Sequence, residues 1–165
     1  MIRIRDAVID DLPAMLDIYN YAIRNLVATF DLEEQSLEQR EVWFYKHGEN
    51  YPLLVAESEG AIIGYCCLSS FREKPAYAKT TELSIYVSNE AHGKGVGTAL
   101  MAVILQRAAQ LGFHTVISGI VGGNEASIAL HKKFGFGFIG QFREVGFKFG
   151  DWQDVHFYQL LLEKK

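Results

Sequence analysis

Residues 81–100 decide the fold, and they read TELSIYV (81–87), SNEAH (88–92) and GKGVGTAL (93–100). The first seven residues alternate polar and apolar side chains, which is the pattern of a half-buried β-strand. Three glycines follow, at positions 93, 95 and 97, and lead into a stretch with helical spacing. Glycines let a ligand approach the backbone closely, and the first N–H groups of a helix are free. This strand, turn and helix therefore predict an anion site suited to a pyrophosphate, with a plain tight turn as the alternative.

Strands and helices alternate along the rest of the chain. Alternating and β-branched runs predict strands at residues 2–7, 53–56, 61–68, 80–87 and 114–121, and two more in the aromatic segment that ends at 155–162. Apolar residues at helical spacing predict helices at 12–26, 36–47, 96–111 and 124–134. An acidic N-cap at Asp10 or Asp11 is expected for the first of these helices. The order predicts an α/β fold, a single domain of residues 1–165 with a mixed central sheet and about four helices on its faces.

Composition excludes several classes of protein. The chain has 165 residues, with 16 Lys and Arg against 20 Asp and Glu, and a formal net charge of -4. Binding to a nucleic-acid backbone needs a clustered excess of positive charge, so no nucleic-acid partner is expected. The longest apolar run, 99–105, is far shorter than the ~20 residues that span a bilayer. Because no apolar leader begins the chain either, we expect no membrane association and a cytoplasmic location.

The two cysteines are adjacent, at positions 66 and 67. In an extended segment their side chains point to opposite faces, so a disulfide between them would be strained. A reactive thiol or part of a metal site is one interpretation, and two small buried apolar residues is the other. The second is favoured because no nearby Cys or His completes a zinc-type cluster. No metal is therefore expected.

The glycine loop lacks the features of two common phosphate-binding motifs. The P-loop pattern G-x-x-x-x-G-K-S/T is absent. A dinucleotide-binding loop has a third glycine where this chain has Thr98, and an acidic residue at the end of the next strand. That strand ends near Val121, followed by two glycines and no acid. A nicotinamide-dependent dehydrogenase is thus disfavoured, and tight binding of NAD would be its signature.

Two segments carry a resemblance to a known superfamily. His92 to Gly97 (HGKGVG) resembles the Q/R-x-x-G-x-G/A pyrophosphate loop of the GNAT superfamily of acyl-CoA-dependent N-acetyltransferases. Residues 124–136 (NEASIALHKKFGF) resemble the second signature of that superfamily, N-x-x-S-x-x-L-x-x-x-x-G-F. His92 departs from the usual Gln or Arg. Backbone N–H groups do most of the phosphate binding, so this departure is expected only to retune it.

Further segments are similar to the phosphinothricin acetyltransferase branch of this superfamily. They are KPAY (74–77), TE (81–82), SIYV (84–87) and the region VGFKFGDWQDV (145–155). The resemblance implies the GNAT fold and acetyl-CoA as co-substrate. It also implies transfer of the acetyl group to the amino group of a small amino-acid analogue, such as phosphinothricin, methionine sulfoximine or methionine sulfone. A homodimer whose interface borders the active site is implied as well.

Glu82 matches the catalytic base of the branch. Attack on a thioester requires a neutral amine, and a positioned carboxylate can remove the proton. Glu82 lies in the middle of an apolar strand, where partial burial would raise its pKa toward neutrality. A structural Glu that faces solvent or pairs with Lys79 is the alternative. His131 occupies a signature position from which it could protonate the leaving thiolate, and a buried structural His is the alternative.

The resemblance also assigns binding residues. The cofactor is expected to contact Ile85, Tyr86, Val87, Gly93, Lys94, Gly95, Val96, Gly97, Thr98, Asn124, Ser127 and Lys133. The substrate is expected to contact Arg72, Glu73, Lys74, Tyr77, Glu82, Leu83 and Ser84. Capping of the helix is the alternative role for Asn124 and Ser127, and a solvated helix face for Lys133. Lys74 stands where the branch commonly has Arg. Lysine lacks the bidentate fork of arginine, so the identity of the substrate stays undecided.

Three rival functions stay open. One is a GNAT enzyme for another small amine, such as a polyamine or an antibiotic. Another is a non-catalytic acyl-CoA-binding module, for which replacement of Glu82 would change no rate. The third is the nicotinamide dehydrogenase.

Overall fold

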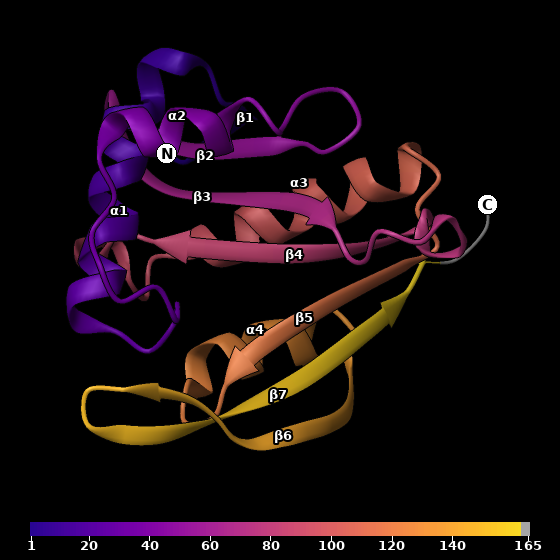
Figure 1. Ribbon diagram of the computed structural model, residues 1–165. Coiled ribbons are helices and arrows are strands. Elements are labelled where there is room, and N and C mark those ends of the chain that lie inside the picture. Colours follow the sequence, from indigo (N-terminus) through magenta and orange to yellow (C-terminus); the bar gives the residue numbers. More distant parts are fainter. Residues whose placement is uncertain (163–165) are drawn as a thin grey trace.

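The computed structural model describes residues 1–162, which form one mixed seven-stranded sheet with helices on both faces (Figure 1). The strand order is β1-β2-β3-β4-β5-β7-β6. The strands are β1 (Arg3–Asp6), β2 (Leu53–Ser58), β3 (Ala61–Ser70), β4 (Thr80–Val87), β5 (Thr115–Val121), β6 (Gly137–Lys148) and β7 (Asp151–Leu161). The helices longer than one turn are α1 (Leu12–Asn25), α2 (Leu37–Phe44), α3 (Val96–Gln110) and α4 (Glu125–Lys133). The predicted α/β architecture, a mixed sheet with four helices on its faces, is confirmed.

Two apolar clusters cover the two faces of the sheet. On one face, α3 and α4 pack against side chains such as Leu83, Val116 and Ile120. On the other, α1 and α2 pack against side chains such as Val55 and Tyr65. Successive residues of a strand point to opposite faces, so each strand contributes alternately to the two clusters. No helix within residues 1–162 is both long and apolar enough to cross a lipid bilayer.

The adjacent cysteines follow this alternation. Cys66 joins the cluster under α3, and Cys67 joins the cluster under α1. Both thiols are free and buried. Burial raises the pKa of both, in the case of Cys67 to about 12. The prediction of two small buried apolar residues is confirmed.

The sheet opens between β4 and β5. These parallel strands pair only from Thr80 to Glu82 on β4 and from Thr115 to Ile117 on β5. Beyond that point β4 continues to pair with β3 on its other side, and β5 with β7. Figure 1 shows β4 and β5 diverging toward their arrowheads. The gap between them is therefore bordered by two backbone edges whose polar groups have no strand partner.

Helix capping agrees with the sequence at two helices and differs at a third. Ser36 and Gln39 form a capping box at the predicted start of α2, although that helix ends at Phe44, earlier than predicted. Asp11 stands at the N-cap of α1 without capping it. Its carboxylate binds the Arg5 guanidinium at 2.7 and 2.9 Å and accepts the Val8 N–H at 2.8 Å. The expected acidic N-cap is thus wrong, because a guanidinium on the neighbouring strand outcompetes the helix amides for this carboxylate.

Lys148, at the end of β6, ties the C-terminal strands to the segment after α1. Its side chain is 3% exposed, and its Nζ donates to the backbone carbonyls of Leu26 at 2.6 Å and Thr29 at 2.8 Å. A third carbonyl, that of Ala22 in the last turn of α1, lies 3.5 Å away. Helix C-terminal carbonyls lack intrahelical partners and attract cations. This lysine therefore fixes residues 26–29 against β6.

Candidate active site

A cleft occupies the gap between β4 and β5. Its walls are formed by consecutive residues of the two strands, by one face of α4 and by the segment after α1, namely Glu82–Tyr86, Ser118–Val121, Asn124, Ser127, His131 and Ala28. Tyr86 closes one side, because its hydroxyl donates to the Ala28 carbonyl at 3.5 Å. The cleft thus contains both predicted catalytic residues, Glu82 and His131.

Glu82 lies at the narrow end of this cleft. It faces Ile117 in the last pair of residues before β4 and β5 part. Its side chain is half-buried and makes no ion pair or hydrogen bond within residues 1–162, Lys79 included. Burial raises the pKa of the carboxyl group above its ordinary value of 4.5. A carboxylate without a partner and with a raised pKa suits a general base.

The glycine loop presents a helix N-terminus at the open end of β4. Gly93 and Gly95 adopt positive φ angles of 78° and 81°, which only glycine accommodates without strain. Gly95 is the N-cap of α3, no side chain caps this helix, and the first bond within it runs from Ala99 N to Gly95 O. The N–H groups of residues 96–98 are therefore free, at the positive end of the helix dipole. This geometry can hold a phosphate group.

Gly97 and Lys133 bring α4 to the same place. Gly97 lies in the first turn of α3 with an ordinary φ, and a Cβ built on it would come 3.0 Å from the Leu130 side chain. This glycine permits close packing of α3 on α4 and takes no part in the bend of the loop. Lys133 Nζ reaches Thr98 Oγ1 at 3.4 Å, so a cation lies beside the free amides. A positive charge there favours an anion.

His131 is buried, with both ring nitrogens in hydrogen bonds. Its Nδ1 donates to the Ser127 carbonyl at 2.7 Å, because a carbonyl can only accept. Its Nε2 lies 2.9 Å from Ser118 Oγ. Burial lowers the pKa of the ring, which favours the neutral form, and in that form Nε2 accepts the Ser118 hydroxyl proton. The neutral ring consequently has no free proton to give to a ligand in the cleft.

Asn124 and Ser127 serve the helix and the cleft together. The Asn124 side chain caps α4 by accepting the Ser127 N–H at 3.3 Å, as the alternative interpretation had it. Both residues also line the cleft. The two roles are compatible, since the cap uses one amide oxygen only.

The predicted substrate residues fall into two groups. Leu83 and Ser84 line the cleft together with Glu82. Arg72, Glu73, Lys74 and Tyr77 are exposed in the loop between β3 and β4 and do not line it. Within this loop, the Arg72 guanidinium lies 5.0 Å from the Phe71 ring centre and 5.9 Å from that of Tyr77. A role for these four residues stays a prediction.

Several cleft residues were missed by the sequence reasoning. They are Ala28 and the run from Ser118 to Val121. Ser118 offered a signal, because it is a polar residue between the apolar positions of a buried strand. Ala28 offered none, because only the fold brings the segment after α1 to β4.

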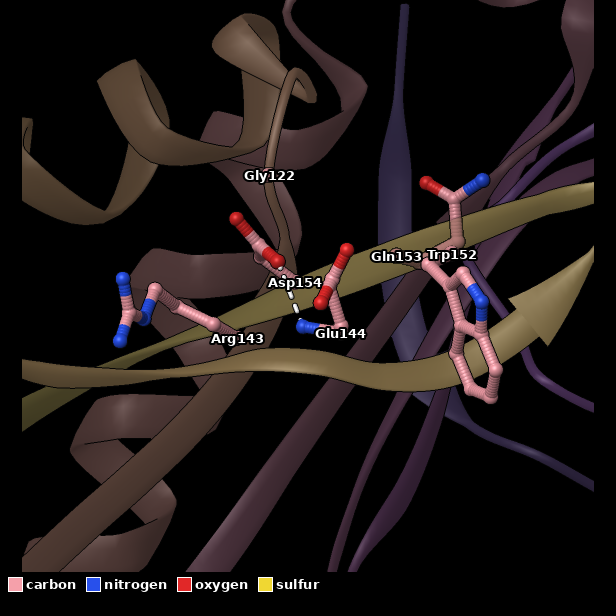
Figure 2. Close-up of a pocket in the computed structure, with 6 residues that line it drawn as sticks. All are labelled: Gly122, Arg143, Glu144, Trp152, Gln153 and Asp154. Carbon is pink, nitrogen blue, oxygen red and sulfur yellow. Dashed lines mark hydrogen bonds between the residues drawn. The ribbon is translucent and has the colours of Figure 1, made fainter.

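A second hollow lies on the β6–β7 hairpin and is shown in Figure 2. Its lining residues are Gly122, Arg143, Glu144, Trp152, Gln153 and Asp154. It forms where β6 bulges, with Glu144 at a φ of 49° and its N–H donated to Asp154 at 2.7 Å (Figure 2). This hollow is wide and open, and none of the predicted site residues lies in it. The cleft that holds Glu82 is therefore the candidate site for the chemistry.

A mixed sheet that splits beside a half-buried carboxylate, with an uncapped helix N-terminus at its open end, is the arrangement that the resemblance to acyl-CoA-dependent acyltransferases implies. Residues 4–157 match the acetyltransferase (GNAT) domain family, and the chain belongs to that family. Among the described residues, no group of three or more His, Cys, Asp or Glu side chains could hold a metal ion.

Several similar proteins are named as acetyltransferases of small amino-acid analogues. The chain is 40% identical to the L-methionine sulfoximine/L-methionine sulfone acetyltransferase of Pseudomonas aeruginosa over 97% of its own length and 94% of that protein. It is 39% identical to the phosphinothricin N-acetyltransferase of Streptomyces coelicolor, over 96% and 95% of the two chains. The structure superposes, with a TM-score of 0.94 and 41% identity, on a phosphinothricin acetyltransferase of Sinorhizobium meliloti in complex with acetyl-CoA, over 98% and 88% of the two chains.

Proposed function

We propose that this protein transfers the acetyl group of acetyl-CoA to the amino group of a small amino-acid analogue of the methionine sulfoximine, methionine sulfone or phosphinothricin type. The observation that carries this proposal is the position of Glu82. Its half-buried carboxylate has no partner in residues 1–162 and stands where β4 and β5 part, inside the cleft. The names of the similar enzymes give the acceptor class.

The glycine loop, the edge of β4 and Glu82 each have a separate role in this proposal. The free amides of residues 96–98, together with Lys133, hold the pyrophosphate of the co-substrate. The unpaired edge of β4, from Ile85 to Val87, binds the extended arm and donates an N–H to the oxyanion of the intermediate. The co-substrate supplies an acyl carbon activated as a thioester. Glu82 takes a proton from the acceptor ammonium, directly or through one water, so that the neutral amine attacks.

A comparison of acceptors tests the substrate class. Purified protein is incubated with acetyl-CoA and one amine at a time: methionine sulfoximine, phosphinothricin or spermidine. The N-acetylated product of each reaction is quantified by mass spectrometry. We expect the two amino-acid analogues to be acetylated with the higher kcat/KM. Preference for spermidine would overturn the substrate class and leave the acetyltransferase chemistry standing. Acetyl-CoA binding without any acetylated product would identify a non-catalytic module.

A homodimer is the second part of the proposal. Large apolar side chains of the β6–β7 hairpin and its ends are each more than half exposed: Phe138, Ile139, Phe142, Val145, Phe147, Phe149, Trp152 and Leu161. Monomeric soluble proteins rarely expose so much apolar surface, and β6 is also an edge strand with free backbone groups. A second copy of the chain is the partner that the resemblance implies.

The mass in solution tests this assembly. Light scattering should give twice the chain mass for the wild type and a monomer for Phe142→Glu, which puts a charge on the hairpin. Val42→Glu is the matched control, because Val42 is exposed on α2, away from the hairpin. A monomeric wild type would refute the dimer. The two free cysteines fit a reducing compartment, so the cytoplasm stays the expected location.

A further inference from the structure

Ser118 and Glu82 approach the cleft from opposite faces of the sheet. The side chains of Glu82 and Leu83 point to opposite faces of the sheet. Glu82 lies on the same face as Tyr86, which packs against the cluster under α1 and α2. Ser118 lies between Val116 and Ile120 of β5 and points to the α3 and α4 face, where it meets His131. Both residues line the one cleft. An acyl carbon held between the strands would thus have a carboxylate on one side and a hydroxyl on the other.

The hydrogen bonds of His131 determine what it can reach. Its Nδ1–H is committed to the Ser127 carbonyl at 2.7 Å, and its Nε2 is directed at Ser118 Oγ at 2.9 Å. The ring is buried, and Phe136 packs against its edge at 4.9 Å between ring centres. Any proton that leaves this ring toward the cleft therefore passes through the Ser118 hydroxyl. Sequence reasoning had assigned that proton to His131 directly.

We propose that Ser118 Oγ is the atom that protonates the departing sulfur, and that His131 supplies and orients it from behind. This proposal deepens the proposed acetyl transfer and rests on it. As the amine nitrogen bonds to the acyl carbon, the C–S bond breaks and its electron pair moves to sulfur. His131 enters this step as the imidazolium, after Nε2 has taken up a proton from water in the cleft through the Ser118 hydroxyl, and Nε2–H then donates to Ser118 Oγ. The Ser118 hydroxyl proton goes to that sulfur, and the Nε2 proton replaces it on Ser118 Oγ. His131 ends neutral. The acceptor ammonium loses two protons in all: Glu82 takes the first before attack and passes it to water, and it takes the second from the nitrogen once the N–C bond has formed.

The burial of His131 is consistent with this direction of transfer. Desolvation lowers the pKa of its ring, which makes the imidazolium a stronger acid than an exposed one. Ser118 is then a catalytic residue, and His131 acts through it.

Replacement of the leaving group tests the proposal. Ser118→Ala should lower kcat with acetyl-CoA about 10²-fold, the low end for an acid or base, and leave KM for acetyl-CoA within a factor of about two. With acetyl-seleno-CoA, whose selenol is more acidic than a thiol and departs without a proton, the same variant should approach the wild-type rate. A purely structural role for Ser118 would lower both rates equally, and that result would overturn the proposal.

Two further variants sharpen the result. His131→Gln should lose about as much as Ser118→Ala, and the double variant should lose no more than either, because the two residues act as one unit. Losses that multiply in the double variant would overturn the relay.

Thr115→Val is the matched control, because it removes a buried hydroxyl from β5 outside the cleft. Full activity of Ser118→Ala in an assay where the wild type acetylates its amine would refute only the relay. An inactive wild type that binds acetyl-CoA would refute the proposed function itself.

Discussion

Glu82 and Ile117 face each other in the last pair that joins β4 to β5, so the carboxylate marks the point where the sheet opens. Because β4 is held by β3 and β5 by β7 beyond that point, the opening is a fixed property of the sheet. The proposed base therefore lies on a strand that is paired on both sides rather than on a loop, which gives it a well-defined position relative to the cleft. The following predictions test this arrangement and the elements that support it.

Replacement of the base is the first prediction. Glu82→Gln keeps the size of the side chain and removes its ability to accept a proton, so kcat should fall roughly 10²–10⁴-fold. Affinity for acetyl-CoA, measured by calorimetry, should stay unchanged, because the pyrophosphate site lies at the other end of β4. Glu57→Gln is the matched control on β2, where the carboxylate lies far from the cleft. Equal rates for Glu82→Gln and the wild type would refute the role of Glu82.

The pH dependence of activity follows from the raised pKa of Glu82. The ionised carboxylate is the active form, so kcat should rise with pH through the pKa of this residue. Burial raises that pKa above 4.5, so half-maximal activity on the acid side should lie above pH 4.5. The measurement is kcat from pH 4 to pH 8 in buffers of constant ionic strength. An acid limb that lies at or below pH 4.5 would contradict the prediction.

The same shift has a consequence for stability. The folded pKa of Glu82 lies above the unfolded one, so the unfolded chain releases this proton at lower pH. The contribution of this group to stability therefore falls as pH rises from the unfolded pKa to the folded pKa. At pH 7 the ionised carboxylate lowers the free energy of unfolding. Glu82→Gln should accordingly increase the free energy of unfolding at pH 7, and increase it less at pH 4. Urea denaturation at the two pH values measures the difference.

The left-handed turn at Gly95 gives a prediction for the pyrophosphate site. Gly95→Ala puts a Cβ on a residue with a φ of 81°, which costs roughly 1–2 kcal/mol of strain. The space around this Cβ is open, so the effect arises from the backbone and not from a clash. KM for acetyl-CoA should rise several-fold while KM for the amine stays constant. Gly48→Ala, in open space at an ordinary φ, should change neither constant.

Lys148 provides a prediction about the wall of the cleft. Lys148→Met leaves the carbonyls of Leu26 and Thr29 without their donor, at a cost of roughly 1–3 kcal/mol for each buried polar group. We expect urea denaturation to show a loss of about 3 kcal/mol in total. Lys46→Met, on an exposed lysine, should change stability by less than about 0.5 kcal/mol. Equal effects of the two substitutions would show that the buried lysine does not hold this segment.

Local sequence patterns predicted the elements and much of the site. The alternation of residues 81–87 placed Glu82 on a strand, and the structure confirms this strand. The glycines at 93 and 95 predicted the turn before α3, because a left-handed backbone has a strong residue preference. The adjacent cysteines predicted two buried thiols on opposite faces, as observed. These features depend on a few neighbouring residues only.

Features that depend on distant contacts were not predictable in this way. Ser118 stands out as a polar residue in a buried strand, but it reaches the cleft only because β5 pairs with β4 over three residues. No local pattern reveals that short pairing. The Asp11 carboxylate was expected to cap α1 and binds Arg5 of β1 instead. Lys148 and Thr29 are 119 residues apart, and their contact exists only in the folded chain. In each case a tertiary partner decides the role of a polar side chain.

The burial of Cys66 and Cys67 simplifies the enzymology of this protein. A thiol reacts with an aromatic disulfide dye as the thiolate, and both cysteines are enclosed and far from ionisation at neutral pH. Colour formed during turnover then comes from liberated coenzyme and not from these two thiols. A continuous photometric assay consequently needs no correction for protein thiols, and the dye can be present from the first second without modifying these cysteines.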